Sequence, residues 1–224
     1  MKILTYNYNM IKFLIKILDF VYRKKCYICG NSDSGEVMCS ECYAKINPLA
    51  LLPNRIIDGV KIYSACRYEN EIKKLIRGVK YHNQKELAKY QAKFMYSYFV
   101  KIVGENFQCA VVPVPMHKSR QRKRKYNHME LVGEELCNLS GWELKTNLIE
   151  RIKDTQPQYN LHTKEREENL KGAFKVNIEN YNGEYILLID DIVTTGSTMA
   201  EMIKTLKSAG IDKIAGLTTA VARL

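Results

Sequence analysis

The chain has 224 residues, 46% of them hydrophobic, and a formal net charge of +11. This length and hydrophobic content suit one full domain with a buried core plus a small module, and the absence of internal repeats or low-complexity segments argues against a repeat protein or a linker. The excess of basic residues favours an anionic partner such as a nucleotide, nucleic acid or anionic lipid, although a basic proteome would give the same charge.

Cysteine usage indicates a reducing compartment. The seven cysteines are an odd number, no convincing signal peptide precedes them, and four of them form two Cys-x-x-Cys pairs. Such pairs are typical of metal binding in the cytosol, so we expect a cytoplasmic protein. The other three lie in apolar surroundings and are expected in the core: Cys66, Cys109 and Cys137.

The first 25 residues predict an amphipathic helix. Their apolar part, residues 10–22, is interrupted by Lys12, Lys16 and Asp19, so it is too short and too charged to span a bilayer. It also lacks a small-residue cleavage site. Packing on the rest of the protein is the favoured interpretation, and weak contact with a membrane surface is the alternative.

Residues 26–47 predict a zinc knuckle. Cys26 and Cys29 are followed after nine residues by Cys39 and Cys42, and two such pairs can place four thiolates tetrahedrally around zinc. A four-cysteine site has no open ligand position, so its role is expected to be structural. The alternative is four reduced cysteines without metal.

The main domain is expected to cover residues 58–224 and to begin with a strand at 58–67. Helices are predicted at 69–78 and 84–103. The end of the first helix carries three residues that could face a phosphate or nucleic acid, or could equally be a solvated helix end: Arg77, Lys80 and Tyr81.

A second strand is predicted at 109–115, followed by a loop of Met116, His117, Lys118 and Ser119. Because ligands of open parallel sheets bind beyond the carboxyl ends of the strands, this loop is a candidate for ligand contact. His117 could equally be a lone surface histidine.

Six basic residues occur within the eight positions 118–125, and Tyr126 and His128 follow closely. Guanidinium groups beside an aromatic ring suit a nucleic acid strand, through phosphate pairing and base stacking. Contact with a diphosphate and a merely solvated helix start are the alternatives. The residues predicted to bind DNA are Arg120, Arg122, Lys123, Arg124, Lys125 and Tyr126.

A helix at 127–140 and a short strand at 143–149 are expected next. The polar segment 151–170 then lies between core strands, and long segments of this kind often act as lids that exclude water. A variable surface excursion is the alternative. The lid residues singled out are Arg151, Thr155 and Gln158.

The most informative stretch is residues 185–198. Ile186 to Ile189 predicts a strand buried on both faces, closed by Asp190 and Asp191. A helix is expected from Thr198, where a capping box with Glu201 would start it. A further buried strand at 213–221 completes an alternation that predicts an α/β fold with a mostly parallel sheet and helices on both faces.

The loop and helix start after the two acids suit a phosphate dianion. Free N–H groups and the positive helix end point at one place, Gly196 allows close approach, and the hydroxyls of Thr194, Thr195, Ser197 and Thr198 add donors. The two carboxylates would repel phosphate, so a vicinal diol or a magnesium ion is their plausible partner. A ribose 5-phosphate bearing a diphosphate supplies all these groups. An ordinary βα turn is the competing interpretation.

This stretch resembles the phosphoribosyl pyrophosphate (PRPP) fingerprint of type I phosphoribosyltransferases. The resemblance implies that Asp190 and Asp191 hold the ribose hydroxyls, that residues 194–198 hold the 5-phosphate, and that residues 116–119 contact the diphosphate. It also implies magnesium with PRPP, and residues 151–170 would cover the site.

From about Leu18 to Arg223 the chain resembles the ComF family of competence-associated phosphoribosyltransferase-like proteins. The resemblance rests on the four cysteines, Lys80-Tyr81, Val-Pro-Val-Pro before His117, the arginine ladder and the PRPP loop. Where the family usually has Gly-Phe-Asn-Gln, this chain has Lys125-Tyr126-Asn127-His128. The lysine puts the tight turn there in question.

The resemblance implies a cytosolic PRPP-binding protein that assists the uptake or use of single-stranded DNA in natural transformation, with other DNA-uptake proteins as candidate partners. Whether it is an enzyme stays open. Two alternatives remain: a nucleobase or amine phosphoribosyltransferase of nucleotide metabolism, and a non-catalytic DNA-binding adaptor or PRPP sensor. The zinc knuckle and the basic ladder argue against the first of these.

Overall fold

A computed structural model of the chain describes residues 24–155 and 163–222. The chain divides into two compact units, Met1–Lys45 and Ile46–Leu224, and each is described by itself. The helix predicted over residues 1–25 lies, except for its last two residues, outside the described part, as does Gln158 of the predicted lid. None of the helices within the two described stretches is long and apolar enough to cross a membrane.

In the first unit, residues 24–45 form two cysteine-bearing turns and one short helix, α2 (Ser40–Ala44). The Cys26 N–H donates to the Asn31 carbonyl at 2.7 Å and closes the first turn. Cys39 immediately precedes α2, so the helix start belongs to the second turn. The two Cys-x-x-Cys pairs therefore come from separate local structures.

The second unit is organised around a six-stranded sheet with the order β1-β2-β8-β7-β3-β4. Strand β1 is antiparallel to β2, and every other neighbouring pair is parallel, which confirms the predicted mostly parallel sheet. The strands are β1 (Arg55–Ile57), β2 (Val60–Arg67), β3 (Ala110–Pro113), β4 (Glu143–Leu144), β7 (Ile186–Val193) and β8 (Ile214–Val221).

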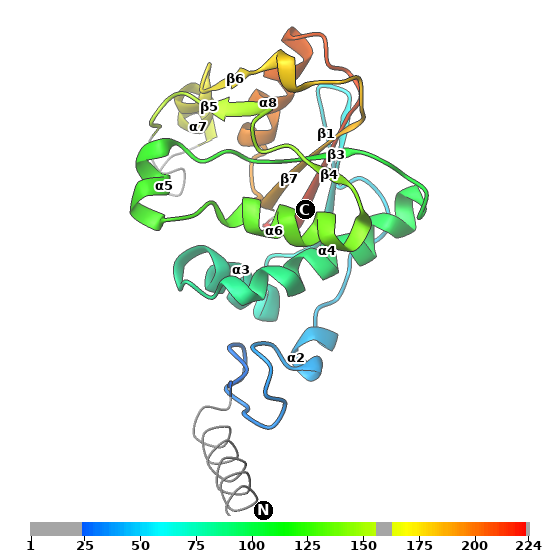
Figure 1. Cartoon of the computed structure of the whole chain (residues 1–224), viewed down its shortest axis with the longest axis vertical. Coiled ribbons are helices and arrows are strands. Elements are labelled where there is room, and N and C mark those ends of the chain that lie inside the picture. Colours follow the sequence, from blue (N-terminus) through cyan, green and yellow to red (C-terminus); the bar gives the residue numbers. More distant parts are fainter. Residues whose placement is uncertain (1–23, 156–162, 223–224) are drawn as a thin grey trace, which may run out of the picture. The chain divides into compact units, whose positions relative to one another are not determined.

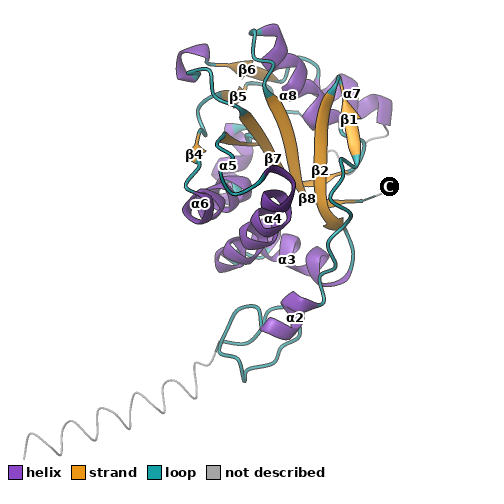
Figure 2. Ribbon diagram, turned by 90° about the vertical axis from the view of Figure 1, so that its right-hand side faces the viewer, coloured by secondary structure: helices purple, strands orange, loops and turns teal. Residues whose placement is uncertain are grey.

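Helices cover both faces of this sheet, as the fold class predicted (Figure 1). Helices α4 and α6 lie side by side on one face (Figure 2), and Gly133 of α6 approaches so closely that a Cβ there would lie 2.8 Å from Leu144 Cδ1. On the other face, apolar residues of α8 pack against Ile186 and Leu188. The helices are α3 (Asn70–Tyr81), α4 (Ala88–Val103), α6 (His128–Ser140) and α8 (Ser197–Ser208), with a 3-10 turn, η1 (Lys85–Leu87).

Strand β7 is central and buried. Its residues Ile186 to Ile189 are each 0% exposed, as predicted for a strand covered on both faces. The strand continues to Val193, however, because β8 remains paired with it up to Val221. The expectation that Asp190 and Asp191 close the strand was therefore wrong. As adjacent strand residues they point to opposite faces of the sheet.

The predicted strand at 143–149 was also wrong. Residues 143–144 form β4 at the edge of the main sheet, whereas β5 (Ile149–Arg151) pairs with β6 (Phe174–Val176) in a separate two-stranded sheet. Leu148 and Ile149 belong to the hydrophobic cluster that also contains α8, so burial pulls the second half of the segment away from β4. Two short helices complete this part, α7 (Thr163–Leu170) and η3 (Ile178–Asn180).

Candidate functional site

The phosphate loop, residues 194–198, connects β7 to α8. Gly196 precedes α8 with φ +89°, a conformation that strongly favours glycine, and a Cβ there would lie 2.9 Å from Ile57 Cδ1. Helix α8 thus begins at Ser197, one residue before the prediction. The predicted capping box is wrong, because Gly196 rather than Thr198 is the N-cap residue and it offers no side-chain cap. Glu201 Oε1 accepts the Gly172 N–H at 2.6 Å.

Side chains within and around the loop fix its shape. The hydroxyls of Thr195 and Ser197 are 2.8 Å apart, and the Ser197 N–H donates to Thr195 Oγ1. From β1, the guanidinium of Arg55 donates to the carbonyls of Thr194, at 3.0 Å, and Thr195. Because Arg55 binds these two carbonyls, it does not compete with a ligand for the N–H groups of the loop. The guanidinium also places a positive charge beside the loop. Sequence reasoning missed Arg55, since it lies about 140 positions from the loop.

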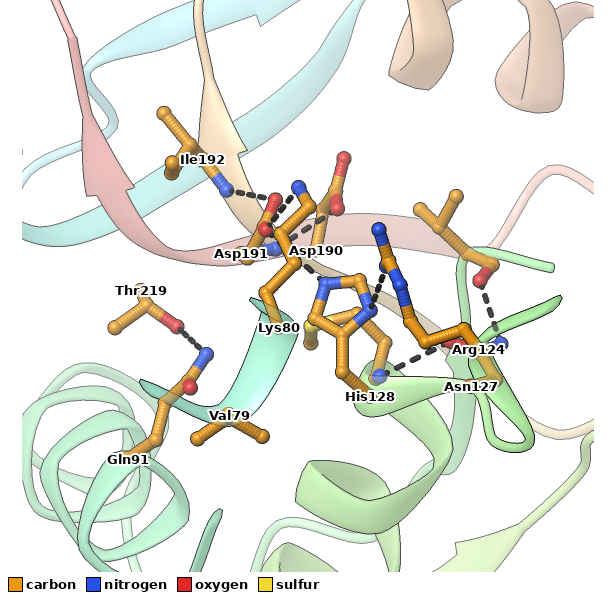
Figure 3. A network of polar contacts seen from close by, with 12 residues as sticks. Val79, Lys80, Gln91, Arg124, Asn127, His128, Asp190, Asp191, Ile192 and Thr219 are labelled. Carbon is orange, nitrogen blue, oxygen red and sulfur yellow. Dashed lines mark hydrogen bonds and ion pairs between the residues drawn. The ribbon is translucent and has the colours of Figure 1, made fainter. Parts of the chain in front are cut away.

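The acid pair, Asp190 and Asp191, is held asymmetrically. Asp191 is 4% exposed, and its Oδ2 accepts Lys80 Nζ at 2.5 Å and His128 Nε2 at 3.1 Å. Figure 3 shows these two side chains reaching Asp191 from the end of α3 and the start of α6. Its Oδ1 accepts the Ile192 N–H at 2.8 Å. Both oxygens of Asp191 are therefore already engaged.

The contacts around Asp191 set the protonation states of Asp191, Lys80 and His128. Burial alone would raise the pKa of Asp191, but the Lys80 ammonium and the His128 hydrogen bond hold it well below its usual value. The same ion pair raises the pKa of Lys80 despite burial. Burial lowers the pKa of His128, so its imidazole is neutral near pH 7.

Asp190 lies on the other face of β7 and is only partly exposed. Burial and the adjacent Asp191 charge raise its pKa well above the usual value. Its Oδ1 accepts the Asp191 N–H at 2.8 Å. The surroundings of Asp190 therefore disfavour its charged form. A hydroxyl donor or a cation bound to the carboxylate would offset this free-energy cost.

Two arginines come together on the Asp190 side. Arg120 donates to the Thr155 carbonyl, and Arg151 donates to Thr155 Oγ1. Arg151 is 8% exposed, and its Nε atom has no hydrogen-bond partner among the described residues. Burial and the nearby Arg120 charge lower the pKa of Arg151 to about 10, which still leaves it cationic at neutral pH. The positive charges of Arg120 and Arg151, together with the N–H of Arg151 Nε, suit an anionic ligand.

The predicted diphosphate loop, residues 116–119, is only partly a loop. Helix α5 (Lys118–Arg124) already begins at its third residue, because His117 caps it by accepting the Ser119 N–H. Ser119 Oγ donates to Asp154 at 2.6 Å, and Lys118 pairs with Glu150 at 2.9 Å. Met116 is half-buried ahead of the cap. These contacts join the loop to the segment that follows β5.

The basic helix, α5, divides its arginines and lysines between two environments. Arg122 and Lys123 are exposed, as is Lys125 after the helix. Arg124 instead turns inward, with its guanidinium 5.2 Å from the ring centre of Tyr81. The predicted DNA-binding residues therefore do not share one surface.

The turn after α5 forms although lysine replaces glycine. Lys125 adopts φ +69°, and its N–H donates to the Gln121 carbonyl at 2.7 Å. A non-glycine residue in this conformation costs about 1 kcal/mol. Tyr126 is anchored next to it, since its hydroxyl donates to the Val79 carbonyl at 2.6 Å.

The four-cysteine cluster, Cys26, Cys29, Cys39 and Cys42, brings its sulfur atoms within 4.8 Å of one another. The Cys29 and Cys39 sulfurs are 3.8 Å apart. Zinc–sulfur bonds of about 2.3 Å in a regular tetrahedron require sulfur separations of about 3.8 Å. The Cys39 N–H also donates to Cys26 Sγ at 3.4 Å, a bond that favours a thiolate. The donor set and its spacing therefore fit a tetrahedral zinc ion.

Comparison with known proteins agrees with this architecture. Residues 142–223, from β4 to the end of β8, match the phosphoribosyl transferase domain family. The chain is 36% identical to Competence protein F of Haemophilus influenzae over 107 residues, which are 47% of each chain. That match thus spans about half of Competence protein F.

Longer matches link the chain to proteins named DNA utilization protein YhgH. Identity is 25% over 193 residues with YhgH of Salmonella typhi and 23% over the same length with YhgH of Escherichia coli, in each case 83% of this chain and 85% of the relative. Together with the domain match and the four-cysteine cluster, these relatives confirm the resemblance to the ComF family.

Proposed function

We propose that this chain, a phosphoribosyltransferase-like protein similar to competence and DNA utilization proteins, binds PRPP at the end of β7 and assists the uptake or use of single-stranded DNA in natural transformation. The observation that carries the proposal is the asymmetric acid pair beside the phosphate loop. Asp191 is satisfied by the chain itself, whereas Asp190 is a partly exposed carboxyl group in need of a donor.

The 5-phosphate of PRPP would bind to the N–H groups and hydroxyls of the phosphate loop at the start of α8. The positive helix end favours a dianion there, and Arg55 adds a nearby positive charge. Asp190 would accept the ribose hydroxyls, which removes the cost of its buried charge. Asp191 would hold its neighbour in position through the shared backbone bond.

The diphosphate would lie toward residues 116–119 and the pair Arg120 and Arg151. Arg151 Nε has no hydrogen-bond partner among residues 24–155 and 163–222, and both arginines are held by Thr155, an arrangement that suits an anion at this point. Magnesium, when bound with PRPP, would neutralise diphosphate charge. Arg120 therefore serves the sugar-phosphate rather than DNA, and DNA would meet the exposed Arg122, Lys123 and Lys125.

If the protein catalyses, the reaction is phosphoribosyl transfer, in which diphosphate leaves C1 of the ribose. The chain's contribution would be position and charge: Arg151 and Arg120 on the leaving group, Asp190 on the diol, and the segment after Arg151 as a cover against water. No acceptor-binding group stands out among these residues. A PRPP-sensing adaptor is the second candidate, and the basic helix beside the site favours it over a salvage enzyme.

Zinc in the four-cysteine cluster is proposed as a structural ion, and the protein is proposed to act in the cytoplasm. The cluster has four thiol donors and no open ligand position, so it would organise residues 24–45 rather than take part in the reaction. Other DNA-uptake proteins are proposed as partners.

Isothermal titration with PRPP and magnesium tests the site. We expect binding by the unchanged protein and a loss of at least tenfold in Asp190→Asn, or about 1.4 kcal/mol. Asp212→Asn is the matched control, since Asp212 is exposed and follows the C-terminal end of α8, whereas the phosphate loop lies at the helix start. Equal PRPP affinity in Asp190→Asn and Asp212→Asn would remove the proposed site. Diphosphate release with a nucleobase present would instead favour the salvage enzyme.

A further inference from the structure

The C-terminal end of α3 and the turn that follows it carry basic and aromatic side chains on the outside of the protein. Residues 77–90 contain four lysines or arginines and one acid. Tyr81 is the last residue of α3 and is 56% exposed, and Lys85 in η1 is exposed as well. Tyr81 therefore presents ring surface to solvent in a region of positive charge.

Two tyrosine rings in this region each have cations close to them. The guanidinium carbon of Arg124 lies 5.2 Å from the centre of the Tyr81 ring, and Lys80 Nζ lies 5.8 Å from the same centre. Lys85 Nζ lies 4.8 Å from the centre of the Tyr126 ring. Each tyrosine thus combines an aromatic ring with an adjacent positive charge, and Tyr81 keeps more than half of its surface exposed beside these cations.

The two tyrosines belong to the same part of the surface. The Tyr126 hydroxyl donates to the Val79 carbonyl at 2.6 Å, so Tyr126 is anchored to the last turn of α3, two residues before Tyr81. Arg124, two residues before Tyr126, reaches the Tyr81 ring in the other direction. Contacts in both directions therefore hold residues 79–81 and 124–126 together.

The basic helix α5 borders this region with a hollow of about 550 Å³. Positions three and four residues apart on α5 and at its end line the hollow: Lys118, Gln121, Arg122 and Lys125. Lys118 is paired with Glu150, but within residues 24–155 and 163–222 no carboxylate pairs with Arg122 or Lys125. These two cations can therefore bind an anion from outside the chain.

We propose that these tyrosines and cations form one binding surface for single-stranded nucleic acid, called here the tyrosine surface. Unpaired bases stack on Tyr81 and Tyr126. Backbone phosphates contact Lys85, Arg122 and Lys125. The inference rests on the proposed function and gives its nucleic acid partner a defined site.

The rings decide which nucleic acid fits. In a duplex each base is covered by its neighbours in the stack, whereas the bases of a single strand can lie against aromatic side chains. Cations alone would attract any polyanion, because phosphate contacts carry no information about the bases. The tyrosine surface therefore favours a single strand over a duplex, with little preference for its sequence.

Fluorescence anisotropy of the full chain at one fixed salt concentration tests the proposal with three probes of equal length: oligothymidylate, an abasic single strand and a duplex. The abasic strand keeps the phosphates and lacks the bases. We expect at least fivefold tighter binding of oligothymidylate than of the abasic strand, which corresponds to about 1 kcal/mol. Equal affinity for these two strands would overturn the proposal, and this comparison needs no variant.

Two substitutions at Tyr81 test the ring directly. Tyr81→Leu removes the ring and keeps an apolar side chain, so it should weaken oligothymidylate binding at least fivefold and leave the affinities for the abasic strand and the duplex unchanged. Tyr81→Phe keeps the ring and should bind like the unchanged protein. Tyr81 is exposed, so both variants are expected to fold, and circular dichroism melts check this. Equal oligothymidylate affinity in the two variants would contradict stacking on Tyr81.

A lysine substitution tests the phosphate contacts. Lys85→Gln should weaken oligothymidylate binding and reduce the slope of log affinity against log salt concentration by about 0.7. Lys204→Gln, exposed on α8, is the matched control and should leave the slope unchanged. Equal slopes in Lys85→Gln and Lys204→Gln would show that Lys85 makes no phosphate contact and would overturn that part of the surface.

Failure of the tyrosine surface and failure of the proposed function give different results. If the unchanged protein binds none of the three probes, the nucleic acid role in the proposed function fails. If it binds oligothymidylate and the abasic strand equally, that role stands and the tyrosine surface is refuted.

Discussion

The acid pair on β7 and the four-cysteine cluster both gather ionisable groups whose charged forms repel one another. At the acid pair the chain supplies the compensating charge itself, through Lys80 and the His128 hydrogen bond on one side of the strand. At the four-cysteine cluster the sulfurs face one another within 4.8 Å, and four thiolates at that spacing need a cation from outside the chain. The first region should therefore fold without its ligand, whereas the second should depend on a metal.

The largest expected effect is metal removal. A structural zinc contributes on the order of 10 kcal/mol to the folding of a small module. We expect about one zinc per chain by elemental analysis, and loss of hydrogen-exchange protection over residues 24–45 after chelation, while β7 and β8 stay protected. Cys42→Ser should behave like the chelated protein, and Cys137→Ser, outside the cluster, should not. Unchanged protection after chelation would contradict the dependence on metal.

Asp191→Asn is expected to have the next largest effect, because it leaves the Lys80 charge against the sheet without its partner. Losing one member of a buried pair typically costs about 3–5 kcal/mol, and the lower value is expected since Lys80 keeps some exposure. Urea unfolding measures the loss. The double variant with Lys80→Met should recover part of it, and a double variant no more stable than Asp191→Asn would argue against the pair as the cause.

Asp190→Asn should act in the opposite direction on stability. Folding raises the pKa of the Asp190 carboxyl group, so the protein loses stability as the pH rises above the pKa of this group in the unfolded chain. Removing the charge of Asp190 should therefore stabilise the fold at neutral pH. The same variant is the one expected to lose PRPP affinity. A melting temperature below that of the unchanged protein would show that Asp190 is not the unsatisfied member of the pair.

The smallest expected effect concerns pH. Burial lowers the pKa of His128 below about 6.5, so in mild acid the unfolded chain binds a proton that the folded chain does not, and stability falls as pH decreases. As the pH is lowered from neutral to mildly acidic, the unchanged protein should lose more unfolding free energy than His128→Gln. If the unfolding free energies of the two proteins, measured in urea, depend equally on pH, the titrating group is not His128.

Most of the fold could be predicted from local sequence patterns. Runs of apolar residues predicted β7, β8 and the helices, since burial on both faces leaves a continuous signature in a strand. Pair spacing predicted the four-cysteine cluster, because each Cys-x-x-Cys is built within one turn. The prediction of one strand at 143–149 was wrong because both ends of the segment contain apolar residues that suit a strand. Packing of Leu148 and Ile149 in the cluster with α8 places the second end in a different sheet from the first.

The order of two acids, a hydroxyl loop with a glycine and a helix after one buried strand could be predicted from the residues alone, because these features are consecutive and their chemistry is local. Which of the two acids is satisfied by the chain depends on the folded arrangement. Lys80, His128 and Arg151 come from separate elements and reach opposite faces of β7, and strand order and helix packing set those approaches. Contacts between residues so far apart in the sequence leave no periodic pattern along the chain. They could therefore not be predicted from it.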